Sequence, residues 1–242
     1  MSSYRDFLEN KTVAIVGPSK SLEYTENNGE YIDSFDVVVR INKGLDILGK
    51  TFSGKRADVL YNSLDLDPAS GGSIFPESLK AHKIKFVRSP YAFSEGFHSP
   101  LVYSHPALAF LGSTYSLEHI DPNLYFNIKK VTNSRVNSGL GAIVDLLSYN
   151  ISKLYITGID FYRSSYLSDY NPHKKWETKK DTEKDLEFLV QDDDGHHHPD
   201  RQYKYFKDLF MVEDRIELDT FMSEIITDTK YDSWDTIPDS GY

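Results

Sequence analysis

Short runs of β-branched and other apolar residues recur along this chain, and a glycine, a proline or a polar residue closes each run. Runs of this kind are typical of strands that are buried on both faces. The sequence predicts six of them, over residues 11–17, 36–41, 57–61, 82–90, 153–162 and 214–219. Segments with helical spacing lie between the runs, and this alternation predicts an α/β fold with a mostly parallel sheet.

The two clearest helical patterns begin at Ser138 and near Pro199. Proline is favoured at the first position of a helix, where its missing N–H group leaves no hydrogen bond unmade. Both segments place apolar residues on one helical face. These residues are Leu140, Ile143, Val144 and Leu147 in the first helix and Tyr203, Phe206 and Phe210 in the second.

We expect a single Rossmann-like domain over residues 1–219, with helices on both faces of the sheet. Residues 163–195 are polar and rich in Asp, Lys and Tyr, so they are predicted to form a lid-like insertion or a long mobile loop. Residues 220–242 are acidic and weakly patterned, which predicts a C-terminal tail. The 242 residues, of which 39% are hydrophobic, are enough for one sizeable core.

The composition and net charge of the chain argue against several classes of function. The chain has no cysteine, which excludes disulfides and cysteine-bound metals. A net charge of −10 argues against a broad surface for nucleic acid or anionic membrane. Residues 1–17 lack the pattern of a signal peptide, and no apolar run reaches the ~18 residues of a membrane span. We therefore expect a cytoplasmic protein, either free or peripheral to a membrane.

Glycines and polar residues stand at the ends of several predicted strands. Gly17, Asn42 and Asn62 follow the first three, and residues 158–162 end the fifth. Because ligands of parallel sheets bind beyond the carboxyl ends of the strands, we expect these positions to converge on one edge. The turn after Gly17 matches neither G-x-G-x-x-G nor the P-loop pattern, so a site of either kind is not indicated.

The helix that begins at Ser138 has two interpretations. Its first N–H groups, on Gly139 and Leu140, could bind a phosphate, and the nearby Arg135 would add a fixed charge. An ordinary core helix with a serine N-cap has the same pattern.

Two further motifs also allow more than one interpretation. Tyr162 and Tyr166 could donate hydrogen bonds to a leaving phosphate, or they could simply pack under the lid. The segment 192–200, Asp-Asp-Asp-Gly-His-His-His-Pro-Asp, could supply metal ligands, a histidine base at a helix start, or a solvated loop. Adjacent residues rarely point at one ion, which makes the metal site the weaker of the first two.

Six blocks of these motifs follow one another over about residues 11–218. They are Gly17-Pro18-Ser19, Phe35-Asp36-Val37 with Arg40-Ile41-Asn42, Gly54-Lys55-Arg56 with Tyr61-Asn62, Arg135-Val136-Asn137-Ser138-Gly139, Gly158-Ile159-Asp160-Phe161-Tyr162 with Tyr166, and His196-His197-His198. In this order the blocks resemble the bacterial sialyltransferases of glycosyltransferase family 42. More distantly, they resemble the animal sialyltransferases of family 29.

The resemblance implies a metal-independent, inverting transfer from a CMP-sugar, with no other cofactor. It implies that Arg135 holds the phosphate or the histidine, and that Tyr162 and Tyr166 hydrogen-bond the leaving phosphate. A histidine of 196–198 would deprotonate the acceptor hydroxyl, and among the three we select His197. The donor would be held by Gly17, Ser19, Asn42, Asn62, Ser138, Gly139, Gly158 and Asp160.

The chain departs from the family pattern near the donor. Pro18 or Lys20 replaces an asparagine, Asn137 replaces a threonine, and Ser63 replaces a proline. The sugar is therefore expected to be sialic acid or a related ulosonic acid such as Kdo. The acceptor would be an oligosaccharide, a lipopolysaccharide or a glycoprotein glycan, and the formation of a homo-oligomer stays open.

Two other functions compete with this one. The first is a glycosyltransferase that uses a UDP- or GDP-sugar and a metal bound by Asp192–Asp194. The second is a catalytically silent module that binds a nucleotide or a carbohydrate.

Overall fold

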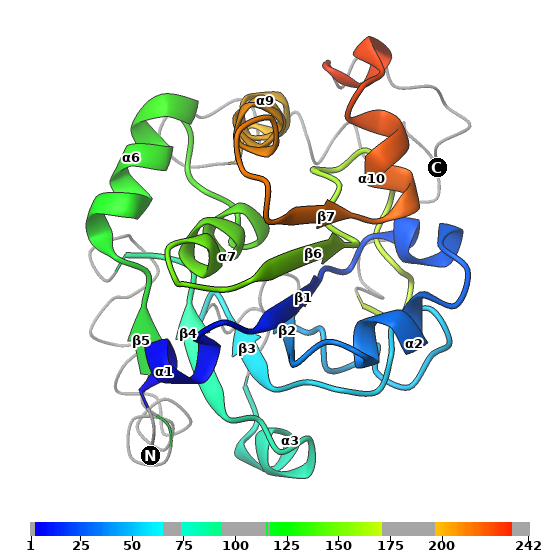
Figure 1. Ribbon diagram of the computed structural model, residues 1–242, viewed down its shortest axis with the longest axis vertical. Helices are drawn as coiled ribbons and strands as arrows, with labels where there is room; N and C mark the ends of the chain where they lie inside the picture. Colours follow the sequence, from blue (N-terminus) through cyan, green and yellow to red (C-terminus); the bar gives the residue numbers. More distant parts are fainter. Residues whose placement is uncertain (1–2, 65–73, 93–114, 116, 171–196, 234–242) are drawn as a thin grey trace.

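The computed structural model describes residues 3–64, 74–92, 115, 117–170 and 197–233. Its strands form one seven-stranded sheet in the order β5-β4-β3-β2-β1-β6-β7, and every neighbouring pair is parallel (Figure 1). The predicted α/β fold is therefore confirmed. The strands are β1 (Thr12–Val16), β2 (Val37–Ile41), β3 (Val59–Tyr61), β4 (Phe86–Ser89), β5 (Leu117–His119), β6 (Lys153–Thr157) and β7 (Ile216–Leu218).

The central strand β1 explains why its sequence is apolar without alternation. Successive side chains of a strand point to opposite faces of the sheet. Val13 and Ile15 enter the core on one face, and Ala14 and Val16 enter the core on the other. Because helices cover both faces, every position of the strand after Thr12 is buried.

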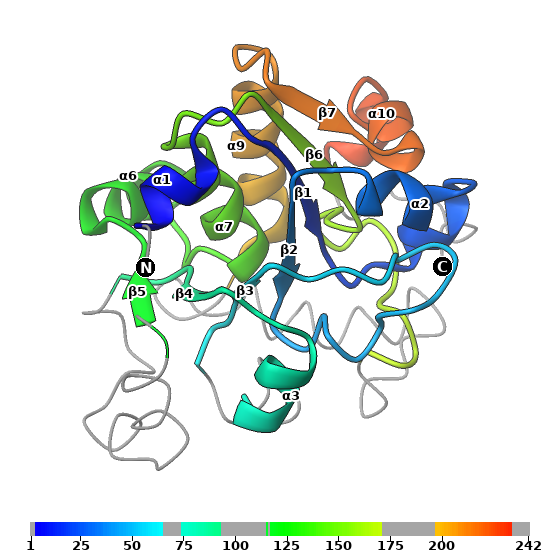
Figure 2. The ribbon, with the colours of Figure 1, turned by 60° about the horizontal axis from the view of Figure 1, so that its bottom comes forward.

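The helices lie in two layers (Figures 1 and 2). One layer packs on the core face of Val13 and the other on the opposite face. The first contains α1 (Tyr4–Leu8), α6 (Pro122–Thr132), α7 (Ser138–Leu147) and α9 (Pro199–Phe210), and the second contains η1 (Lys20–Tyr24), α2 (Asn28–Asp33) and α3 (Pro76–Ala81). None of the helices in the described part of the chain is long and apolar enough to cross a membrane.

The structure corrects two of the predicted boundaries. The fifth predicted strand ends at Thr157 rather than at residue 162, because Gly158 adopts a positive φ of 66°. Residues 220–231, expected to belong to a tail, form α10 (Thr220–Ile225) and η2 (Thr229–Tyr231). Met222 and Ile225 of α10 are buried in the core, so this segment belongs to the domain. Residues 234–242 lie outside the described part of the chain.

The order of the strands reverses at β1. Successive strands run from β1 out to β5, and β6 then pairs on the other side of β1. The crevice at such a point is the usual ligand site of an open parallel sheet. Gly17 and Gly158 follow β1 and β6 there, in backbone contact. A Cβ atom on Gly17 would lie 2.2 Å from the Gly158 carbonyl oxygen, and one on Gly158 would lie 2.7 Å from that of Gly17.

This contact predicts the effect of Gly158→Ala. The alanine must adopt a left-handed conformation, which costs about 1–2 kcal/mol, and its methyl group must also displace Gly17, which adds about 1–3 kcal/mol. Gly49→Ala is the matched control, since Gly49 has a φ of 88° with no atom within 4 Å of the added Cβ. Urea unfolding should show the larger loss for Gly158→Ala, and equal losses would contradict the close contact.

Candidate active site

The segments that follow β1 and β6 run together at the carboxyl edge of the sheet. The Ser19 N–H donates to the Gly158 carbonyl over 3.0 Å, and the Leu167 N–H donates to the Pro18 carbonyl over 2.9 Å. These bonds bring together half of the predicted donor-site residues. They are Gly17, Ser19, Gly158 and Asp160.

Asp160 faces the interior of this junction. Its carboxylate accepts hydrogen bonds from the hydroxyls of Ser19 and Ser164, and only 3% of the residue is exposed. Burial raises the pKa of Asp160 to about 6, while the two hydroxyls lower it. In this geometry Asp160 clamps the two loops to each other.

The N-terminus of α7 differs by one residue from the prediction. Asn137 is the N-cap, and its side chain accepts a hydrogen bond of 2.8 Å from the Leu140 N–H. Ser138 is the first helical residue, so its hydroxyl is not used for capping. That hydroxyl lies 3.4 Å from Asn42 Nδ2 and 3.3 Å from the Tyr91 hydroxyl. Ser138 therefore faces the residues that follow β2 and β4.

Tyr91 connects this helix start with Arg135. The guanidinium carbon of Arg135 lies 5.0 Å from the centre of the Tyr91 ring, a cation–π distance. Sequence reasoning missed Tyr91, although it follows β4 just as Asn42 follows β2. The aromatic segment that begins at this point lacks a periodic pattern, so nothing in the sequence distinguishes Tyr91 from the other aromatic residues near it.

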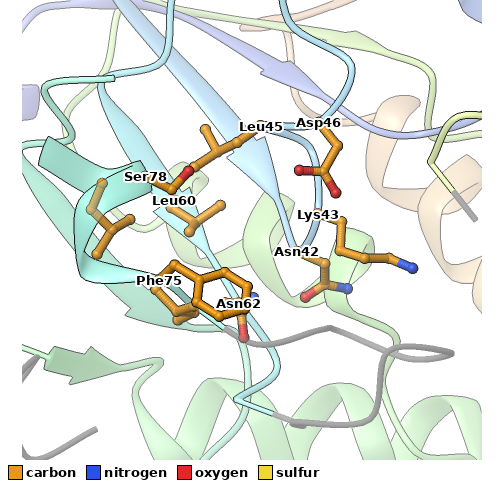
Figure 3. Close-up of a pocket in the computed structure, with 10 residues that line it drawn as sticks. Asn42, Lys43, Leu45, Asp46, Leu60, Asn62, Phe75 and Ser78 are labelled. Carbon is orange, nitrogen blue, oxygen red and sulfur yellow. The ribbon is translucent and has the colours of Figure 1, made fainter. Parts of the chain in front are cut away.

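Asn42 and Asn62 line a cavity of about 190 Å³ beside the ends of β2 and β3 (Figure 3). Asn42 has a positive φ of 52°, and its side-chain Oδ1 accepts a hydrogen bond of 2.9 Å from the Ser63 N–H. Tyr170 is a further hydrogen-bond partner of the Asn42 side chain. The rest of the lining is Lys43, Leu45, Asp46, Leu60, Ile74, Phe75, Ser78 and Leu79.

Tyr162 and Tyr166 form an aromatic pair on the loop after β6. Their ring centres are 6.1 Å apart in an edge-on arrangement, and their hydroxyls are hydrogen-bonded to each other. Burial raises the pKa of Tyr162 to about 12, so its phenol stays protonated and able to donate at neutral pH. Ionised Tyr91 would also raise the pKa of Tyr162, and the Tyr91 hydroxyl lies 3.3 Å from that of Ser138.

His197 directly precedes the cap of α9. Its Nδ1 atom lies 3.0 Å from the Arg135 carbonyl oxygen. A carbonyl can only accept, so Nδ1 carries the proton and Nε2 carries the lone pair of the neutral ring. This is the tautomer that a general base needs. His198 is the N-cap residue of α9, and burial lowers its pKa.

Gln202 holds the starts of α7 and α9 together, and sequence reasoning missed it. Its amide group donates a hydrogen bond of 2.8 Å to the Arg135 carbonyl and accepts one of 2.9 Å from the Asn137 N–H. The residue has no exposed surface. Because the same Arg135 carbonyl also binds His197, Gln202 fixes the position of the histidine relative to the first turn of α7.

Some predicted site residues lie outside the described part of the chain. They include His196, residues 171–195 of the predicted lid and the Asp192–Asp194 triplet proposed as an alternative metal site. Within the described residues, no group of three or more His, Cys, Asp and Glu side chains is arranged to hold a metal ion.

The described edge thus combines three kinds of group. The start of α7 contributes the Ser138 hydroxyl and the Gly139 N–H, since the Leu140 N–H is bound by the Asn137 cap. The loop after β6 contributes two protonated phenols, and His197 contributes an imidazole nitrogen. Such a set can stabilise an anion and accept a proton.

The buried Asp160 predicts a pH-dependent contribution to stability. Because its pKa is higher in the folded than in the unfolded chain, the folded state binds the proton more tightly, and stability from this group rises as the pH falls from 7 to 4. The effect approaches about 3 kcal/mol. The Asp160→Asn variant cannot titrate at this position. The free energy of unfolding of the wild type, minus that of Asp160→Asn, should therefore increase as the pH falls from 7 to 4. A pH-independent difference would contradict the burial of a titrating carboxyl group.

No family model matches the sequence, and no curated protein matches it. Solved structures do match. The sialyltransferase CstII from Campylobacter jejuni, in complex with cytidine-5′-monophosphate, superposes with a TM-score of 0.53 at 13% identity, over 89% of this chain and 84% of that chain. The α-2,3-sialyltransferase Cst-I from Campylobacter jejuni gives a TM-score of 0.49 at 16% identity, over 92% of this chain and 80% of that chain. The superposition on CstII shows that the chain has the α/β fold of a bacterial sialyltransferase, as its motifs predicted.

Proposed function

We propose that this protein is a glycosyltransferase that moves a sugar from a CMP-sugar to a hydroxyl group of a glycan acceptor. The observation that carries the proposal is the convergence of the α7 start, the Tyr162–Tyr166 pair and His197 on the carboxyl edge of the sheet. In addition, the CstII structure that shares this fold contains CMP.

The donor is proposed to lie along this edge. The nucleoside would occupy the crevice between β1 and β6, next to Gly17 and Gly158, and the phosphate would face the first turn of α7 at Ser138 and Gly139. The cavity beside Asn42 and Asn62 has about 190 Å³, whereas a complete drug-sized ligand needs about 300–1,000 Å³. It is therefore suited to part of the donor, such as the sugar. Sialic acid and Kdo are both candidates for that sugar.

The proposed reaction is a single displacement with inversion at the anomeric carbon. The acceptor oxygen forms the new bond to this carbon as the bond to the phosphate oxygen breaks, and the bonding electrons leave with CMP. His197 Nε2 takes the proton of the acceptor hydroxyl. Tyr162 and Tyr166 donate hydrogen bonds to the phosphate as its negative charge grows, and removal of one such donor typically costs about 10²–10³ in rate.

Metal independence follows from the chemistry proposed. A CMP-sugar releases a nucleotide with one phosphate, and protonated phenols and helix N–H groups can stabilise its charge without a metal ion. The acceptor is proposed to be a glycan of an oligosaccharide, a lipopolysaccharide or a glycoprotein.

Thermal melting with CMP, UDP and GDP, each with and without EDTA, tests the donor. CMP at ~100-fold its dissociation constant should stabilise the protein by about 2.7 kcal/mol, and EDTA should leave that shift unchanged. A shift with UDP or GDP that EDTA abolishes would favour the metal-dependent alternative at Asp192–Asp194. A CMP shift without turnover of any CMP-sugar would favour the silent binding module.

His197→Ala tests the base. The transfer rate should fall by about 10²–10⁴, because the acceptor loses its proton acceptor, while the CMP-induced melting shift should persist. His82→Ala is the control, since His82 is an exposed residue at the end of α3. Steady-state kinetics of His196→Ala and His198→Ala should show smaller losses, and a larger loss in either variant would reassign the base.

A further inference from the structure

Arg163 has no exposed surface, although it lies in a loop between two tyrosines of the proposed site. A guanidinium group is costly to bury unless its charge and its donors are matched by partners. The side chain must therefore be held by specific contacts, and these contacts show what it organises.

The contacts of Arg163 join three segments of the chain. Nη1 donates to the Phe161 carbonyl over 2.7 Å, and Nη2 donates to Asp200 Oδ1 over 2.8 Å. Nε and Nη2 also donate to the Tyr231 carbonyl, over 3.2 and 3.1 Å. The guanidinium carbon lies 4.1 Å from the centre of the Tyr203 ring. Arg163 thus ties the loop after β6 to α9 and to η2.

On the loop side, Arg163 secures a strained turn. Phe161 and Tyr162 both have a positive φ, of 53° and 66°. Each such conformation is unfavourable for a residue with a side chain, and it persists only where the surroundings impose it. The Arg163 N–H closes the turn on the Asp160 carbonyl at 3.1 Å, and the side chain binds the Phe161 carbonyl from within. The direction of the Tyr162 ring depends on this turn.

On the helix side, Asp200 lies in the first turn of α9, three residues after His197. The ion pair between Arg163 and Asp200 therefore connects the loop that carries the phenol with the segment that carries the histidine. The proposed displacement needs both groups at once, the phenol on the leaving phosphate and the histidine on the attacking hydroxyl. A misplacement of about 1 Å in such an arrangement can cost about 10²-fold in rate.

We propose that Arg163 is a positioning residue that sets the separation of Tyr162 and His197 through its contacts with the Phe161 carbonyl and Asp200. This inference rests on the proposed function, and it adds a residue that touches neither substrate nor reacting atoms.

Arg163→Lys is the first test. Lysine keeps the charge but cannot bind the Phe161 carbonyl, Asp200 and the Tyr231 carbonyl together. Release of CMP from CMP-N-acetylneuraminic acid or CMP-Kdo, with lactose as acceptor, should show kcat lowered by about 10²-fold and a much smaller change in KM. Arg215→Lys is the matched control, since Arg215 also binds two carbonyls, of Leu147 and Tyr149, and one carboxylate, of Glu213, but at the start of β7. An equal loss of kcat in both variants would overturn the proposal.

A double-mutant cycle with Tyr162→Phe separates positioning from general destabilisation. If Arg163 acts by placing the Tyr162 phenol, Arg163→Lys should cost far less in the Tyr162→Phe background than in the wild type. Losses that simply multiply would refute the role. Should Arg163→Lys fail to fold, Asp200→Asn weakens the same link by removing the negative charge of the ion pair, from a partly exposed position, and the same cycle applies.

An NMR readout distinguishes failure of this inference from failure of the proposed function. In ¹⁵N-histidine-labelled protein, Asp200→Asn and Arg163→Lys should shift the ring signals of His197, and Arg215→Lys should not. If the wild type shows no CMP-induced melting shift and releases CMP from neither donor, but these NMR shifts are seen, the proposed function fails while the link between loop and helix holds. If the signals of His197 do not move, the link is disproved whatever the activity.

Discussion

The contact between the backbones of Gly17 and Gly158 is the constraint on which the carboxyl edge depends. It lets two neighbouring parallel strands, β1 and β6, send their loops out of the sheet side by side, at the point where the strand order reverses. Any side chain at either position would force the loops apart. Because Tyr162 follows Gly158 by only four residues, and Ser19 follows Gly17 by two, both depend on this junction for their position.

Around this junction the fold accepts two kinds of unfavourable arrangement. Asp160 and Arg163 are charged groups in the interior, and Asn42, Phe161 and Tyr162 have left-handed backbones. Strain and buried charge of this kind persist only where the surrounding structure determines them, and they concentrate at functional sites. At this edge the hydrogen bonds of Asp160 and Arg163 hold the strained turn, so the unfavourable groups support one another.

The sequence allowed prediction of those parts of the site that depend on local pattern. The amphipathic spacing after Ser138 and the proline near the start of α9 located both helices, and the strand-end rule placed Asn42, Asn62 and Gly158 on one edge. The prediction of Ser138 as the N-cap was wrong, because asparagine and serine both cap helices well and only the three-dimensional structure shows that the Asn137 side chain reaches the Leu140 N–H.

The residues that were missed act over long sequence separations. Gln202 binds a segment more than sixty residues earlier, and Arg163 reaches both Asp200 and Tyr231. No spacing rule connects such positions, since the contact exists only after the sheet has brought β6 next to α9. α10 was missed for the same reason, because its short apolar face is recognisable only when β7 and η1 lie against it.

The structure also distinguishes His197 from His198. In sequence the histidines are adjacent and equivalent, but α9 gives them different tasks. His198 occupies the N-cap, where its carbonyl accepts a hydrogen bond from the Gln202 N–H and its ring is desolvated.

His197 lies one residue outside the helix, and the Arg135 carbonyl accepts a hydrogen bond from its Nδ1. That carbonyl is also bound by Gln202 and belongs to the residue that stacks on Tyr91. Of these two histidines, His197 is the one whose tautomer is set by the chain segment that leads into α7. The bond from Nδ1 leaves the lone pair of a neutral ring on Nε2, which is the tautomer that the proposed removal of a proton from an acceptor hydroxyl requires.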